Sequence, residues 1–149
     1  MAPTKINWYR VLTPLVLASL GTWQGSIYLV ALDNEGYQRA TSTLLMVSVT
    51  FVGFLLTLVA IISALSKRKL IINMAKSGHL GKMFQRFFIA IFGYFVTIVL
   101  GIIFQIANLP NTIYVAVAFL WPFLYSMILT FNGTVHFYNF VVVLNKTEH

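Results

Sequence analysis

The chain has no cysteine, only three acidic residues and only four prolines among its 149 residues. The lack of cysteine excludes a disulfide framework, a thiolate metal site and a cysteine nucleophile. Charged residues make up 9% of the chain and apolar residues 59%, whereas soluble domains are roughly a quarter charged. Because a soluble fold of this length could not bury so much apolar surface, the composition indicates a membrane protein.

The apolar residues are gathered into four long runs, which read as Val11–Leu32, Ser42–Leu65, Phe87–Ala107 and Thr112–Phe131. A helix needs about 20 apolar residues to cross a hydrocarbon layer of about 30 Å, and each run is near or above that length. Too few residues remain outside the runs for a separate soluble domain. The sequence therefore predicts a single all-α domain, residues 1–149, with four transmembrane helices.

Six of the ten cations lie in one loop, residues 66–86, between the second and third runs: Lys67, Arg68, Lys69, Lys76, Lys82 and Arg86. Short loops rich in lysine and arginine stay on the cytoplasmic side, so this loop and both termini are expected inside. A net charge of +7 would suggest nucleic acid in a soluble protein. Here membrane insertion and binding to anionic lipid headgroups account for it, so no nucleic-acid partner is expected.

Small residues recur at helical spacing in the first three runs, and in lipid such residues let two helices approach closely. Gly21 and Gly25 form a G-x-x-x-G pattern, which predicts packing either within the protomer or between protomers. A face of the second helix, with Thr50 and Ala64 at its ends, is expected to meet a face of the third helix that begins at Ala90, in a hairpin. The helix-packing candidates are Gly21, Gly25, Gly53, Thr57, Ala60, Gly93, Thr97 and Gly101.

Two of the expected helices are longer than a bilayer requires. Nothing between Ser42 and Ser77 breaks a helix, and Gly78 is the first stop signal. The fourth helix is expected to run on to Leu144. The second helix is therefore predicted to extend into the cytoplasm, and the fourth to do the same unless it tilts strongly. Residues 33–39 are expected to form a short polar turn outside.

The chain shows no catalytic or cofactor-binding pattern. Its three histidines have no ligand-like spacing, which argues against a metal site, and no phosphate-binding or hydrolase motif occurs. No aspartate, glutamate, lysine or arginine lies at the expected depth of a helix, which disfavours proton-coupled transport. We therefore expect a protein that is not an enzyme and binds no cofactor or metal.

Neutral polar residues remain, and they either bond between helices or line a path. Asn132, His136 and Asn139 lie near one face at the inner end of the fourth helix. Around the axis of an oligomer, that face would ring the inner mouth of a pore. The alternative is interhelical hydrogen bonding and, for His136, an interfacial side chain that reaches the headgroups.

The chain resembles RexB-like membrane proteins of phage-exclusion systems and, more loosely, the membrane subunit of the Kiwa anti-phage system. The resemblance is carried by chain length, by four spans with both ends inside, by the segment Thr57–Lys69, and by a tail with Tyr138-Asn139 and Asn145–His149. It is architectural and covers most of the chain. It implies an effector of the bacterial inner membrane that acts with a cytosolic partner and depolarises the membrane.

The leading hypothesis is therefore an oligomeric inner-membrane effector, or a channel-like component of an anti-phage defence system, that forms homo-oligomers and receives a signal from a cytosolic protein. The alternative is a non-conducting accessory subunit of a larger membrane complex. A small transporter for lipids or drugs is disfavoured by the lack of an intramembrane carboxylate.

Overall fold

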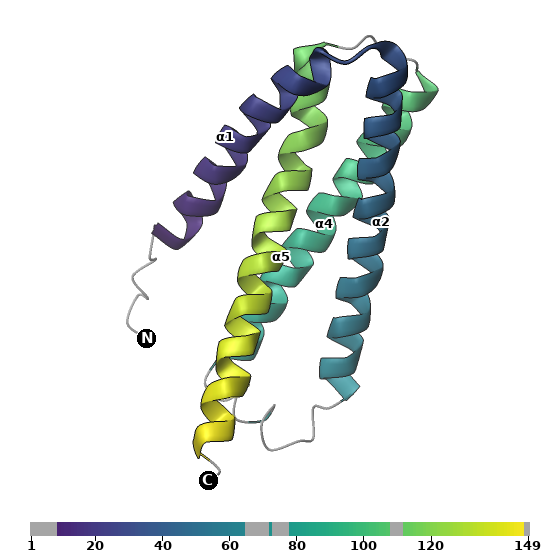
Figure 1. Ribbon diagram of the computed structural model, residues 1–149. Coiled ribbons are helices and arrows are strands. Elements are labelled where there is room, and N and C mark those ends of the chain that lie inside the picture. The colour runs from purple at the N-terminus through teal and green to yellow at the C-terminus, as the bar shows by residue number, and fades with distance from the viewer. Residues whose placement is uncertain (1–8, 65–71, 73–77, 108–111, 148–149) are drawn as a thin grey trace, which may run out of the picture.

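The computed structural model describes residues 9–64, 72, 78–107 and 112–147, and its four long helices are shown in Figure 1. In chain order they are α1 (Tyr9–Val30), α2 (Asn34–Ala64), α4 (His79–Ile106) and α5 (Ile113–Thr147). The expected all-α fold with four helices is confirmed.

Three of these helices are long and apolar enough to cross a membrane: α2 over Asn34–Ala64, α4 over Leu80–Ile106 and α5 over Ile113–Val135. The first helix, α1, has 22 residues, which is long enough, but it is not among the three. Its second half contains Gly21, Thr22, Gln24, Gly25 and Ser26, which lower its hydropathy. A transmembrane position for α1 stays a prediction from the sequence.

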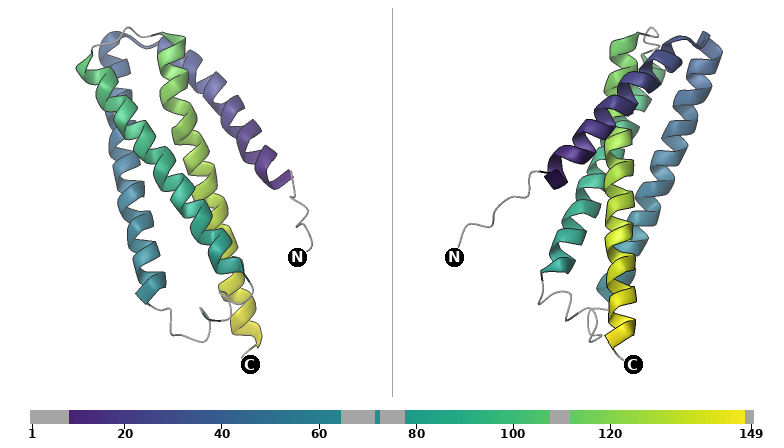
Figure 2. Two further views of the ribbon diagram at one scale, coloured as in Figure 1. Left: turned by 180° about the vertical axis from the view of Figure 1, so that it is seen from behind. Right: turned by 60° about the vertical axis from the view of Figure 1, so that its left-hand side comes forward.

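The helices do not form a closed four-helix bundle, because they pack in the order α1, α5, α4, α2. Helix α5 lies along both α1 and α4, and α4 lies along both α5 and α2. Helices α1 and α2 meet close to the turn that joins them and diverge from there, as Figures 1 and 2 show. Each of these two end helices therefore has one main neighbour and leaves much of its surface exposed.

The core lies between α2, α4 and α5. Helix α2 buries Ser48, Leu55 and Ile62, which are seven residues apart and lie on one face. The Tyr94 ring of α4 stacks on Phe51 of α2, with ring centroids 5.4 Å apart. It also meets Phe123 of α5 edge-on at 6.0 Å. The middle of the fold is thus filled by aromatic side chains from three helices.

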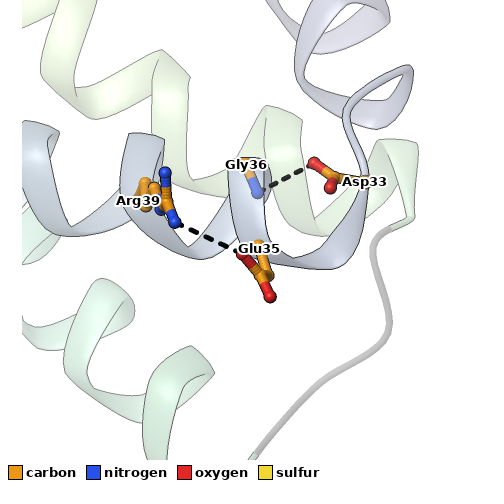
Figure 3. Close-up of polar contacts among 4 residues, drawn as sticks. All are labelled: Asp33, Glu35, Gly36 and Arg39. Carbon is orange, nitrogen blue, oxygen red and sulfur yellow. Dashed lines mark hydrogen bonds and ion pairs between the residues drawn. The ribbon is translucent and has the colours of Figure 1, made fainter.

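Helix α2 begins earlier than the sequence predicts, so the expected polar turn over residues 33–39 is wrong. The Asp33 carboxylate accepts a hydrogen bond of 2.9 Å from the Gly36 backbone N–H, as an N-terminal capping residue does. Glu35 lies in the first turn, where the helix dipole favours a negative charge, and it pairs with Arg39 at 3.3 Å. Figure 3 shows both contacts. These contacts allow the polar residues to form the first two turns of the helix.

The other expected helix ends are described only in part. Gly78 has a left-handed backbone with φ of 72° and precedes α4, a conformation that favours glycine. The expected extension of α2 beyond Ala64 lies largely outside the described residues. Helix α5 has 35 residues, with Pro122 inside it. At 1.5 Å per residue it is about 52 Å long, which confirms that it is longer than a bilayer requires.

Candidate functional site

The small residues of α4 line its contacts with α5 and α2. A Cβ atom on Gly93 would overlap Ser126 Oγ and lie 3.4 Å from the Pro122 carbonyl oxygen of α5. A Cβ on Gly101 would come within 2.6 Å of Leu45 on α2 and 2.8 Å of Phe119 on α5. Thr97 between them is fully buried. We call the contact around Gly93 and Ser126 the α4–α5 seam.

The G-x-x-x-G residues of α1 lie against α5. Cβ atoms built on Gly21 and Gly25 would each come 3.2 Å from a leucine methyl group, of Leu124 and Leu120 respectively. Beside them on α1 a face of small residues is buried: Ala18, Thr22 and Ser26. The structure therefore places this pattern within the protomer, which was one of the two arrangements expected.

Within the part of the chain that the structure describes, the small residues on one face of α2 have no such partner. The outer face of α2, as we call it, comprises Thr50, Gly53, Thr57, Ala60 and Ala64, and all five are exposed. A Cβ on Gly53 would meet no atom of the described chain within 4 Å. Helices α2 and α4 do pack together, but the expected contact between this face and the small residues of α4 is wrong.

The reason is that α2 carries two opposite faces with heptad spacing. Leu55 and Thr57 are two residues apart, which at about 100° per residue places their side chains on nearly opposite sides of the helix. The side with Ser48, Leu55 and Ile62 is buried, and larger side chains there fill the space beside the aromatic core. The smooth outer face is left pointing away from the fold.

The outer face is bordered by a shallow apolar hollow on the same helix, lined by Met46, Val47, Thr50, Phe51 and Phe54. The hydroxyls of Thr50 and Thr57 donate to carbonyl oxygens of their own helix, each at 2.8 Å. Because those hydroxyls are satisfied internally, the surface that they share presents mainly carbon atoms to its surroundings.

Of the basic loop, residues 66–86, the structure describes Ile72 and residues 78–86. Lys82 is exposed and Arg86 is partly buried, and both lie in the first turns of α4. The other four expected headgroup-binding residues lie outside the described residues: Lys67, Arg68, Lys69 and Lys76. The structure thus places two of the six cations at the end of the fold where α4 begins.

The candidate pore-mouth residues all lie in α5. Asn132 is exposed, and the side chains of His136 and Asn139 are outside what the structure describes. Within the described residues no group of three or more histidines, aspartates or glutamates could hold a metal ion.

Two polar contacts join helices. Gln105 is one of the neutral polar residues that the sequence offers for bonding between helices, but the partners in both contacts were not predicted. Gln105 of α4 donates a hydrogen bond of 2.9 Å from Nε2 to Ser42 Oγ of α2. Trp121 of α5 donates one of 3.4 Å from Nε1 to Ser19 Oγ of α1. Each ties an end helix to its one main neighbour. The sequence shows only that such neutral polar residues exist, because their pairing depends on how the helices cross.

The fold and its exposed apolar faces define a class, that of small helical proteins with several candidate membrane spans. Comparison of the chain with protein-family models, with curated proteins and with solved structures found no match. The function is therefore argued from the faces described above.

Proposed function

We propose that the protein is the membrane subunit of a homo-oligomer that acts as an effector, or as a channel-like component, in a bacterial anti-phage defence system. The main support for the oligomer is the outer face of α2. Its small residues are exposed, and a Cβ on Gly53 would meet no atom of the described residues within 4 Å. The defence role rests on the resemblance to RexB-like proteins.

The argument for assembly is one of packing. In lipid, apolar residues gain little from leaving the hydrocarbon, so helix association depends on close van der Waals contact. A face built from Gly53, Thr57 and Ala60 lets another backbone approach, and its spacing of 3 and 4 residues suits the shallow crossing of a left-handed pair. In a homo-oligomer, that other backbone is α2 of a second copy of the chain.

Charge supports an orientation with the α4 N-terminus inside. Lys82 and Arg86 lie at that end of the fold, whereas Asp33 and Glu35 lie at the opposite end, where α1 joins α2 (Figure 1). The cytoplasmic preference of cations then puts the basic loop and both termini inside. This orientation lets Lys82 and Arg86 contact anionic headgroups of the inner membrane.

A cytosolic partner would meet the far end of α5. Helix α5 has 35 residues, or about 52 Å at 1.5 Å per residue, whereas the hydrocarbon layer is about 30 Å thick. A straight crossing therefore leaves about 20 Å of the helix over, at its C-terminal end. In the proposed orientation this part emerges into the cytoplasm, where it offers a surface for a soluble sensor.

One observation favours the alternative, a non-conducting accessory subunit. The middle of the protomer is filled by Phe51, Tyr94 and Phe123, so conduction would require a path between protomers. An accessory subunit would use the same outer face of α2 to pack against a larger membrane protein.

Expression in bacterial cells with a potential-sensitive dye separates the two functions. An effector dissipates the membrane potential when expressed alone at high level, and Gly53→Leu abolishes that effect by blocking assembly. Gly81→Leu is the matched control, because Gly81 also has open space around it but lies outside the outer face. An unchanged potential with the unmodified chain at equal membrane abundance would support the accessory subunit.

A further inference from the structure

Hydroxyl groups buried in this fold fall into two sets. The first set donates to carbonyl oxygens of the same helix at 2.7–3.0 Å: Thr22, Ser26, Thr41, Ser48 and Thr97. The second set has no hydrogen-bond partner among the described residues: Tyr94 Oη, Ser126 Oγ and Thr130 Oγ1. Tyr94 and Ser126 are fully buried and Thr130 is 6% exposed. An unpartnered buried hydroxyl is costly, so the second set requires an explanation.

The three hydroxyls belong to one place in the fold. Ser126 and Thr130 are four residues apart and share a face of α5. Ser126 Oγ occupies the space where a side chain on Gly93 would begin, so it points into the α4–α5 seam. The Tyr94 ring of α4 packs edge-on against Phe123, which lies three residues before Ser126 on the same face of α5, so its hydroxyl belongs to the same contact between the two helices.

The Tyr94 hydroxyl cannot donate to a carbonyl oxygen of its own helix, as the threonine hydroxyls of the first set do. A serine or threonine hydroxyl can turn toward the carbonyl four residues back in its own helix. The Tyr94 hydroxyl sits at the far end of a rigid ring, which Phe51 and Phe123 hold by stacking and edge contact. Its partner must therefore come from another helix or from a bound molecule.

We propose that Tyr94, Ser126 and Thr130 form an internal hydration site in the α4–α5 seam, in which a bound water molecule bridges the two helices. Buried water occupies sites that offer roughly two to four polar partners, and three hydroxyls meet that need. All three lie within the candidate spans of α4 and α5, where bulk water is excluded. The inference does not depend on the proposed defence function.

The site is tested by radiolytic oxidation of the full-length protein in nanodiscs, read residue by residue by mass spectrometry. X-ray pulses generate hydroxyl radicals from bound water, which oxidise the aromatic ring beside it. We expect Tyr94 to be oxidised severalfold faster than Phe87 and Phe119, which are 0% and 1% exposed. Oxidation of Tyr94 as slow as that of these two rings would overturn the proposal.

Two variants test whether the Ser126 and Thr130 hydroxyls hold the water molecule. Ser126→Ala combined with Thr130→Val removes two of the three partners and should lower Tyr94 oxidation to the rate of Phe87. Thr97→Val is the matched control, because the Thr97 hydroxyl donates to the Gly93 carbonyl of its own helix, and it should leave the Tyr94 rate unchanged. Equal rates in the double variant and the unmodified protein would contradict the site. The comparison of Tyr94 with Phe87 and Phe119 uses the unmodified protein, so its outcome does not depend on whether a variant folds.

Discussion

The face of α4 around Gly93 and the outer face of α2 have the same kind of sequence and opposite surroundings. Gly93 is so close to α5 that a side chain would overlap Ser126, whereas Gly53 has open space around it. Both faces consist of small residues at spacings of 3 and 4. The difference teaches that a pattern of small residues does not by itself say whether a helix face is packed within the protomer.

The largest effect is expected at Gly93. Replacing Gly93 with leucine forces a side chain into Ser126 and the Pro122 carbonyl, so α4 and α5 must separate. Overpacking typically costs about 1–3 kcal/mol, and contact with backbone leaves little room to adjust. We expect a clear drop in the denaturation midpoint of the detergent-solubilised protein. An unchanged midpoint would mean that the two helices are not in close contact there.

Gly53→Leu should change the oligomeric state and leave the stability of the protomer unchanged. The unfolding midpoint of the protomer should stay the same, because no atom of the described chain lies within 4 Å of a Cβ there. The oligomeric mass in nanodiscs should fall to that of a single copy, because a leucine prevents close helix approach. The control Gly81→Leu should change neither quantity. An oligomer that survives Gly53→Leu would show that assembly uses another surface.

A smaller effect is expected at the start of α2. Asp33→Ala removes the cap on the Gly36 N–H, and loss of such a cap costs about 1 kcal/mol. We expect faster amide hydrogen exchange over the first turns of α2 and no change in the α4–α5 seam. Asp33→Asn is the control, since asparagine also caps helices and should retain most of the protection.

The smallest effect is expected for the ion pair of Glu35 and Arg39, whose side chains are about four-fifths exposed. Pairs of this kind on a helix surface contribute about 0.3–0.5 kcal/mol. Arg39→Ala should therefore shift the unfolding midpoint only slightly, and less than Asp33→Ala. A shift as large as that of Asp33→Ala would indicate that Arg39 has a second partner.

Much of the fold follows from the sequence, because apolar runs of this length form helices. The boundaries of α2 were less predictable. A polar run such as residues 33–39 reads equally well as a loop, and only the Asp33 cap and the buried side chain of Tyr37 show it to be helical.

The sequence also does not predict which face of α2 meets α4, and the reason here is different. In a soluble protein the apolar side of a helix faces the core, but lipid accepts leucine and glycine faces alike. Both heptad faces of α2 are apolar, so the pattern alone does not say which one meets α4. The shape of the neighbouring side chains decides, and the aromatic stack of Phe51 on Tyr94 depends on tertiary contacts that periodicity does not encode.

We propose above that the outer face of α2 is an interface between copies of this chain. The lack of cysteine makes disulfide cross-linking in native membranes the most direct test, because any introduced cysteine is unique. Thr57→Cys should form a covalent dimer on mild oxidation, since a disulfide requires Cα atoms about 4.4–6.8 Å apart. Phe92→Cys, at a position on α4 that is 69% exposed, should stay monomeric. Monomer at both positions, or equal dimer at both, would contradict the claim.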